Sequence, residues 1–496
     1  MRMGACRLGL LGLMLVIATG ARAQTPQGAD PCDAIVSACR QAGFTQGGGS
    51  RGTGLWVNCV DPIIQGLASK AARPLPTIAA QLVTDCRTAR PGFGGTSPVT
   101  YQLGPARVFA TNEQLSFYGF QWGPSDGQFG AIPLGGGQYA FYCSAGAKRS
   151  CALPANGKTQ GTFGFTGTLD SLTGASCQRL FGPGDGPPGW NFTEHYAGGG
   201  KVAPFWSGGK RGWLLVFHGE YQWSNPLTPD HWCVAGKGPG SVPCYYSSLG
   251  LAVSTDEGRS FKVAGEVYQP SQPLSVFLGG GRNMVVSYGS LVVADANGRH
   301  LDNPPPDPTK AYFYLFAMDS LPSLPGVCGR VGCAAVARAP YNDVIQAALS
   351  GDPHRVAQVF RKYDASAPDP WTQPATGDSP DQQRGSGRFA SIISDGGRGG
   401  ADVIYDSAFK IHLMVEQVAQ GFVVRSSTDL IHWSAPIGPT YHEDGRTVFY
   451  PSFLGETGDP TIAGPSPRVY FTSFVEFPKW KEAEFKSVAL QLMSLR

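Results

Sequence analysis

The chain has little net charge, and this shortage excludes whole classes of partner. Its 496 residues carry 39 Lys and Arg against 36 Asp and Glu, a formal charge of +3. Arg2, Arg7 and Arg22 account for the excess, and all three lie near the N-terminus. A balanced chain does not concentrate polyanions around itself, so nucleic acid and anionic membrane surfaces are not expected partners. We expect a neutral partner.

The chain also lacks an apolar run of the ~18 residues that a membrane span needs. Its most apolar stretch, Leu8 to Ala18, is too short and follows two arginines. With the small residues Ala21 and Ala23 behind it, this stretch has the pattern of a secretory signal peptide over residues 1–23. These features predict a soluble monomer that a bacterium exports to the periplasm or secretes.

The C-x-x-C spacing of zinc sites is absent, so the cysteines predict disulfides in an oxidising compartment and no metal centre. Close spacing predicts three local bridges, Cys143–Cys151, Cys233–Cys244 and Cys328–Cys333. Two more are expected among Cys32, Cys39, Cys59 and Cys86, which leaves Cys177 unpaired.

Residues 24–97 are a segment of their own. Helical spacing from Cys32 to Cys39 predicts a short helix, and Gly54–Ile63 and Leu75–Cys86 predict two more. A segment this small buries little core, so disulfides would stabilise it. It resembles a small cysteine-stapled helical module that precedes exported proteobacterial proteins. Attachment to a glycan, attachment to the rest of the chain, and a folding spacer are all open as its role.

Residues 98–496 have little helical pattern and are rich in Gly, Pro, aromatic and β-branched residues. Turn signals recur every ~8 to 12 residues, as in folds of many short antiparallel strands. Only Asn342–Ala348 and Pro353–Val359 predict helices. The predicted strands form five groups: Ala106–Ala110, Leu115–Phe120, Gln138–Cys143 and Gly161–Gly167; Lys201–Trp206, Trp213–His218, Leu249–Ser254 and Phe261–Tyr268; Ser290–Ala294, Ala311–Met318, Cys333–Arg338 and Val356–Tyr363; Asp402–Tyr405, Ile411–Glu416 and Gly421–Ser427; Val448–Phe453, Arg468–Phe474 and Ser487–Met493.

Two segments far apart predict the same turn. Ser254 to Phe261 and Ser427 to Trp433 each place a Ser, an Asp two residues later and an aromatic residue at the end. The Asp can accept backbone N–H bonds across the turn, Gly258 can take a positive φ, and the aromatic ring can fold back into the core. Both turns report on the fold rather than on catalysis.

The first turn resembles the Asp box of sialidase-type propellers. The second resembles the S-x-D-x-x-x-W turn of five-bladed arabinanases, xylosidases and invertases. The resemblance implies a mainly β fold, a five-bladed β-propeller over residues 98–496 behind the small helical module, and a carbohydrate as substrate or ligand. No cofactor is expected, and a structural calcium ion in the propeller channel stays open.

In such a propeller, the rim is formed by residues just before inner strands or at the ends of second strands. In the second group this position brings Glu194, His195 and Tyr196 together with His218, Glu220, Tyr221 and Trp223. In the fourth group it selects Asp402, in a stretch similar to the D-P-x-V-I stretch of arabinanase-like enzymes although the Pro is missing. In the fifth it selects Glu443 and Arg446. Alternatively, the two histidines only bond backbone carbonyls and Glu443 is solvated surface.

Glycosidic hydrolysis needs one protonated and one ionised carboxyl group. Glu220 or Glu194 in an aromatic pocket would be the acid and Asp402 the base. Arabinanase-like enzymes place their base on the first inner strand, but Tyr101 to Val108 carries no acid.

Two other functions therefore stay open. The first is a non-catalytic glycan-binding or envelope-associated propeller, in which Trp190, Trp223, Tyr196 and Tyr221 stack on sugar rings. The second is a sialidase-like exo-glycosidase, in which Arg282, Arg398 and Arg446 bind a substrate carboxylate.

Overall fold

The computed structural model describes residues 30–45, 52–66, 71–89, 93–95, 97–114, 128–146, 160–172, 178–222, 245–271, 286–319, 333–365, 367–377, 386, 390–394, 401–418, 421–475 and 481–495. The predicted signal peptide lies outside these residues. No helix in these ranges is long and apolar enough to cross a membrane.

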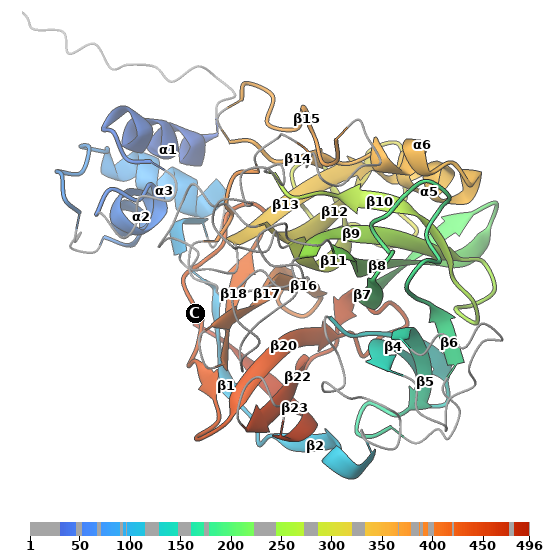
Figure 1. Ribbon diagram of the computed structural model, residues 1–496. Helices are drawn as coiled ribbons and strands as arrows, with labels where there is room; N and C mark the ends of the chain where they lie inside the picture. The colour runs from blue at the N-terminus through green and yellow to red at the C-terminus, as the bar shows by residue number, and fades with distance from the viewer. Residues whose placement is uncertain are drawn as a thin grey trace, which may run out of the picture.

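Five sheets, antiparallel apart from one short parallel pair, stand around a common centre, as the sequence predicts (Figure 1). Blade one is β3 (Gly130–Gly135), β4 (Gln138–Gly146), β5 (Gln160–Gly167) and β6 (Gln178–Phe181). Blade two is β7 (Tyr196–Ser207), β8 (Lys210–Gln222), β9 (Tyr245–Ser254) and β10 (Lys262–Tyr268). Blade three is β11 (Val286–Asp295), β12 (Ala311–Asp319), β13 (Cys333–Pro340), β14 (Arg361–Lys362) and β15 (Gln373–Pro374).

The last two blades complete the ring. Blade four is β16 (Ala401–Asp406), β17 (Ile411–Val418), β18 (Gly421–Ser427) and β19 (Tyr441–His442), with β21 (Ile462–Ala463) at its inner edge. Blade five is β20 (Thr447–Leu454), β22 (Arg468–Val475) and β23 (Lys481–Ser494), followed by β1 (Val99–Leu103) and β2 (Arg107–Ala110). The inner strands β3, β7, β11, β16 and β20 contact one another in turn around the centre.

One group of predicted strands is wrong. Ala106–Ala110 was expected to open the first blade, but β2 pairs with β23 and completes the last one. β1 does the same, from Val99 opposite Ser494 to Leu103 opposite Leu490. Periodicity predicts a strand but not its partner, so this non-local pairing could not be read from the local pattern. The predicted Leu115–Phe120 strand lies outside the described residues.

Two helices belong to blade three. α5 (Tyr341–Ser350) and α6 (Pro353–Ala357) follow β13 and pack against β10 of blade two. The strand predicted over Val356–Tyr363 is therefore reduced to the short β14, since its first residues belong to α6.

The N-terminal helices form a separate small layer at one side of the ring (Figure 1). They are α1 (Pro31–Gln41), a π-helical turn (Trp56–Val60), α2 (Asp61–Gln65) and α3 (Ala80–Ala89), followed by a 3-10 turn (Phe93–Gly95). Two buried disulfides, Cys32–Cys86 and Cys39–Cys59, hold them together. Disulfides of this kind fit an oxidising compartment.

The other cysteine predictions have mixed outcomes. Cys143 is a free, buried thiol, so the predicted Cys143–Cys151 bridge is wrong. The reason is its position, because Cys143 lies inside β4 opposite Phe163 rather than at the end of a hairpin. Cys333 is disulfide-bonded. Cys151, Cys177, Cys233, Cys244 and Cys328 lie outside the described residues.

We expect the double substitution of Cys39 and Cys59 by Ser to destabilise the helical layer by about 3 kcal/mol, because the bridge closes a loop with a sequence separation of 20. Hydrogen exchange of α1 should rise accordingly, while exchange of β8 stays unchanged. Cys143→Ser is the control, and equal exchange of α1 in all three proteins would contradict the prediction.

Both predicted turns are confirmed between the third and fourth strands of their blades. In the first, Asp256 accepts bonds from the Ser260 amide at 3.0 Å and its hydroxyl at 2.6 Å, and Phe261 is buried. In the second, Asp429 accepts from the amides of Ile431 and His432.

The second turn has a further role that the sequence did not reveal. Its His432 ring contacts two rings of the helical layer, with centroid distances of 4.7 Å to Trp56 and 5.1 Å to Phe93. The His432 Nδ1 bonds Asp429 at 2.6 Å, which fixes the ring. The helical layer therefore docks on the turn of blade four.

A buried histidine on β17 predicts acid sensitivity. His412 is 1% exposed, and neither ring nitrogen has a hydrogen-bond partner among the described residues. Burial, helped by the nearby His300, lowers the pKa of His412 to about 3. In the unfolded chain His412 binds a proton near pH 6.5, whereas in the folded chain it stays neutral at that pH. The free energy of unfolding therefore falls as the pH drops below 6.5.

We expect His412→Phe to reduce the slope of the free energy of unfolding against pH between pH 7 and pH 5, by up to about 1.4 kcal/mol per pH unit. Urea unfolding at several pH values measures the slope. His442→Gln is the matched control, because the His442 side chain is 63% exposed. Parallel slopes for the wild type and His412→Phe would contradict the prediction.

A candidate active site at the rim of blade two

The ends of β7 and β8 bring most of the predicted rim residues together. β7 begins at Tyr196 and β8 runs on to Gln222, so that Tyr196 lies opposite Glu220 and Gly198 opposite His218. Residues two apart on a strand share a face, which puts His218 and Glu220 side by side. The rim is built by strand register rather than by a loop.

His218 and Glu220 form a close pair. The His218 Nε2 lies 2.9 Å from the Glu220 Oε1, and their side chains are 12% and 14% exposed. The edge of the Tyr196 ring meets the His218 ring at 5.5 Å. At this separation the pair can share one proton between nitrogen and oxygen, in a place that is sheltered but open to solvent.

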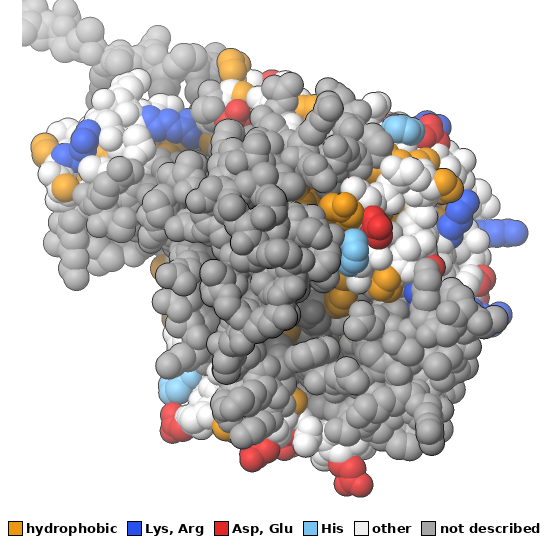
Figure 2. All heavy atoms as spheres, viewed as in Figure 1, with side chains coloured by type: hydrophobic (Ala, Val, Ile, Leu, Met, Phe, Trp, Pro, Cys, Tyr) orange, Lys and Arg blue, Asp and Glu red, His pale blue; other side chains and the backbone are white. Residues whose placement is uncertain are grey.

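The neighbouring side chains are more exposed. Glu194 and His195 are exposed, and the His195 amide donates to the Glu220 carbonyl at 3.1 Å. The centroids of the His195 ring and the half-buried Tyr221 ring lie 5.4 Å apart in an edge-to-face arrangement. On this face of the molecule, a histidine and an acidic side chain lie among hydrophobic ones beside a hollow near the centre (Figure 2). The ends of β7 and β8 therefore bring carboxylates, imidazoles and aromatic rings close to one another.

The structure places Asp402 elsewhere. Its carboxylate is fully buried, lies 2.9 Å from the Lys201 Nζ, and accepts a bond from the Phe453 amide at 2.6 Å. Burial raises the pKa of Asp402, and the Lys201 ammonium offsets this only in part. Lys201 also donates to the Phe453 carbonyl. The pair thus joins blades two, four and five, and a buried carboxylate in this setting cannot meet a water molecule as the predicted base must.

A bulge in β7 places Lys201 in this position. Gly199 and Gly200 have φ values of 75° and 146°, and the register shifts between Gly198 and Lys201. A Cβ on Gly200 would lie 2.7 Å from the Val216 carbonyl oxygen, so a side chain does not fit there. Bulges of this kind re-aim the side chains next to them.

The structure does not place Asp402 beside Glu220 at the open rim. The Asp402 carboxylate is fully buried and paired with the Lys201 ammonium, whereas the Glu220 side chain is 14% exposed at the end of β8. We therefore correct the assignment of Asp402 as the base.

One further predicted binding residue, Trp190, packs within the protein. It is buried, and its ring centroid lies 6.3 Å from that of Phe192 and 5.4 Å from that of His354 of α6. Trp223, Arg282 and Arg398 lie outside the described residues.

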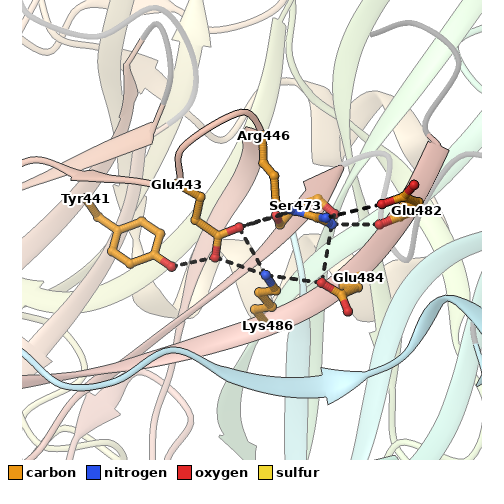
Figure 3. Close-up of polar contacts among 7 residues, drawn as sticks. All are labelled: Tyr441, Glu443, Arg446, Ser473, Glu482, Glu484 and Lys486. Atoms are coloured by element: carbon orange, nitrogen blue, oxygen red, sulfur yellow. Dashed lines mark hydrogen bonds and ion pairs between the residues drawn. The ribbon is translucent and has the colours of Figure 1, made fainter. Parts of the chain in front are cut away.

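Arg446 belongs to a polar cluster between blades four and five (Figure 3). Its guanidinium donates to the Ser473 hydroxyl at 2.6 Å and to the Glu482 carbonyl at 2.6 Å, and lies 3.3 Å from the Glu484 carboxylate. Its charge is therefore already paired, so this residue does not supply the free arginine that a sialidase-like site would need.

Glu443 sits in the same cluster and is not solvated surface. Its side chain is 13% exposed and accepts from the Tyr441 hydroxyl at 2.8 Å, from Ser473 and from Lys486 at 3.1 Å. Burial alone would raise the pKa of Glu443, but these hydrogen bonds outweigh it and lower the pKa. The cluster holds the rim of blade five in place.

Sequence reasoning missed Lys201 as a partner of Asp402. A signal was present, because a Lys and an Asp each stand at the start of an otherwise apolar inner strand. Opposite charges on two inner strands become buried when the blades assemble, and buried charges are normally paired. Among the described residues no group of His, Cys, Asp and Glu could hold a metal ion.

Comparisons with known proteins give the following findings. No family model matches the chain, and no curated protein does. The chain is similar to a solved GH62 hydrolase in complex with xylotriose, at 11% identity over 79% of this chain and 97% of the other, with a TM-score of 0.40. It is also similar to a family 117 glycoside hydrolase of the marine bacterium Zobellia galactanivorans, at 9% identity over 79% and 90%, with a TM-score of 0.42. It is similar as well to an arabinoxylan arabinofuranohydrolase of Bacillus subtilis, at 12% identity over 79% of this chain and 67% of the other, with a TM-score of 0.34.

Proposed function

We propose that the protein is an exported glycoside hydrolase that cuts a neutral poly- or oligosaccharide at the rim of blade two. The observation that carries this proposal is the His218–Glu220 pair, 2.9 Å apart and half-buried at the end of β8. Such a pair is suited to hold a proton and release it to a leaving oxygen. The rings of Tyr196, Tyr221 and His195 around it supply the apolar surfaces that sugar rings pack against.

The residues have the following roles in this proposal. The pair of Glu220 and His218 gives its proton to the glycosidic oxygen as the bond to the anomeric carbon breaks. The exposed Glu194 replaces Asp402 as the ionised carboxylate, and it takes the proton of the water that adds to that carbon. Export is supported by the N-terminal pattern Arg2 to Ala23 and by the two disulfides.

Purified protein incubated with a panel of neutral plant and bacterial polysaccharides tests the proposal. We expect new reducing ends from at least one polymer, at a rate proportional to the protein concentration. Absence of reducing ends across the panel, with the protein folded, would refute the hydrolase.

A non-catalytic glycan-binding propeller is the second candidate. The observation that favours it is the burial of Asp402. Hydrolysis needs two carboxyl groups, and the burial removes one of the three candidates, so that Glu194 and Glu220 are left among the described rim residues of blade two. In that case calorimetry would show binding of a polymer that the protein leaves intact, and Tyr221→Ala would weaken the binding.

A further inference from the structure

A cavity of about 190 Å³ lies where the helical layer meets blade four. Trp56 and Asp61 line it from the helical layer, and Ser394, Arg425, His432 and Trp433 line it from the propeller. A cavity of ~150 Å³ is large enough for a benzene molecule, so this one has room for a single six-membered ring and not for an oligosaccharide. Ligand sites occur preferentially at such domain interfaces.

The walls of the cavity are partly apolar and partly polar. The indole rings of Trp56 and Trp433 give apolar surfaces. The hydroxyl of Ser394 has no hydrogen-bond partner among the described residues although Ser394 is only 7% exposed. A buried hydroxyl without a partner is costly, and a ligand that offers its own hydroxyl groups would satisfy it.

The charges of the cavity argue against an anionic ligand. Arg425 is 8% exposed, and its guanidinium lies 2.6 Å from the Glu416 carboxylate and 2.8 Å from the Ser434 carbonyl oxygen. The Arg425 cation is thus matched by an acid behind it, and the Asp61 carboxylate can accept hydrogen bonds from the hydroxyl groups of a neutral ligand. The His432 Nδ1 lies 2.6 Å from the Asp429 carboxylate, so the opposite ring nitrogen remains for a hydrogen bond with a ligand hydroxyl group, which can both donate and accept.

We propose that this interface cavity binds one neutral sugar ring, separately from the rim of blade two. Ring faces of aromatic side chains suit the C–H face of a sugar, and the Ser394 hydroxyl and the His432 Nε2 suit its hydroxyl groups. The site uses both the helical layer and the propeller, so it gives that layer a role in recognition. It does not depend on the proposed hydrolase activity.

Calorimetric titration of the full-length mature protein with free pentoses and hexoses, one at a time, tests the proposal. We expect saturable binding of at least one monosaccharide at millimolar concentration. Ser394→Leu, which fills the cavity, should weaken this binding at least tenfold, whereas Glu220→Gln should leave it unchanged. Ser350→Leu, at the exposed end of α5, is the matched control and should also leave it unchanged.

Three results would overturn the proposal. The first is the absence of saturable binding by every monosaccharide tested. The second is binding that survives in Ser394→Leu while that variant keeps the urea unfolding midpoint of the wild type. The third is binding of toluene with no binding of any sugar, which would show an apolar cavity. Loss of polymer hydrolysis without loss of monosaccharide binding would refute only the proposed hydrolase.

Discussion

Asp402→Leu is expected to lower the free energy of unfolding by about 3 to 5 kcal/mol, because it leaves the Lys201 ammonium buried without a counter-charge. The Phe453 amide loses its acceptor in the same substitution, which adds to the cost. Urea unfolding followed by far-ultraviolet circular dichroism measures the change in the midpoint. Lys201→Met should have a similar effect for the converse reason.

The double variant Lys201→Met with Asp402→Leu separates a charge effect from a packing effect. It should recover most of the lost stability, since two apolar side chains can replace a buried ion pair at little cost. Recovery should stay incomplete because the Phe453 carbonyl and amide remain without their partners. Lys310→Met is the surface control, since the Lys310 side chain is 81% exposed and solvent screens its pairing with Asp307. A single variant as stable as the wild type would contradict the central role of the pair.

Glu220→Gln is expected to lower turnover of any polymer that the protein hydrolyses by ~10²- to 10⁴-fold, the usual contribution of a general acid or base. The amide keeps the size of the side chain and a hydrogen bond to His218, so the unfolding midpoint should barely change. Initial rates of reducing-end release give the turnover. Glu194→Gln should lower turnover as well, if water is activated there.

Glu257→Gln is the control for both substitutions. Glu257 is an acid of the first Asp-box turn, with a side chain that is 74% exposed and lies between the outer strands of blade two. Its loss should leave turnover unchanged. Full activity of Glu220→Gln would remove this residue from the mechanism and shift the search for the acid to the rim of another blade.

The sequence predicts five blades because the main strands of each blade are neighbours in the sequence. Blade two shows this most clearly, since its four predicted strands and the turn at Ser254 to Phe261 all lie within one continuous stretch. Alternating patterns and turn residues specify such neighbours directly. The closing strands β1 and β2 escaped prediction because their partner β23 lies at the other end of the chain.

The site was predictable where strand register alone decides it. His218 and Glu220 lie two residues apart on one strand, so their meeting follows from the pleat. Asp402 illustrates the limit, since its position at the start of an inner strand is compatible with a rim residue and with a channel residue. The bulge at Gly199 and Gly200 and the reach of Lys201 across the channel decide between them, and both are properties of the closed ring.

The pairing of β1 with β23 also determines when the ring can close. During synthesis or translocation of a chain from its N-terminus, β1 appears among the first structured segments, and its partner appears last. The strands of the earlier blades can pair as they emerge, and the Lys201–Asp402 pair can reach Phe453 once β20 has emerged, but the seam of blade five must wait for β23. The helical layer, by contrast, has all four of its cysteines within the first 86 residues and can form both bridges early. We therefore expect oxidation at the front of the chain to precede closure of the ring at its end.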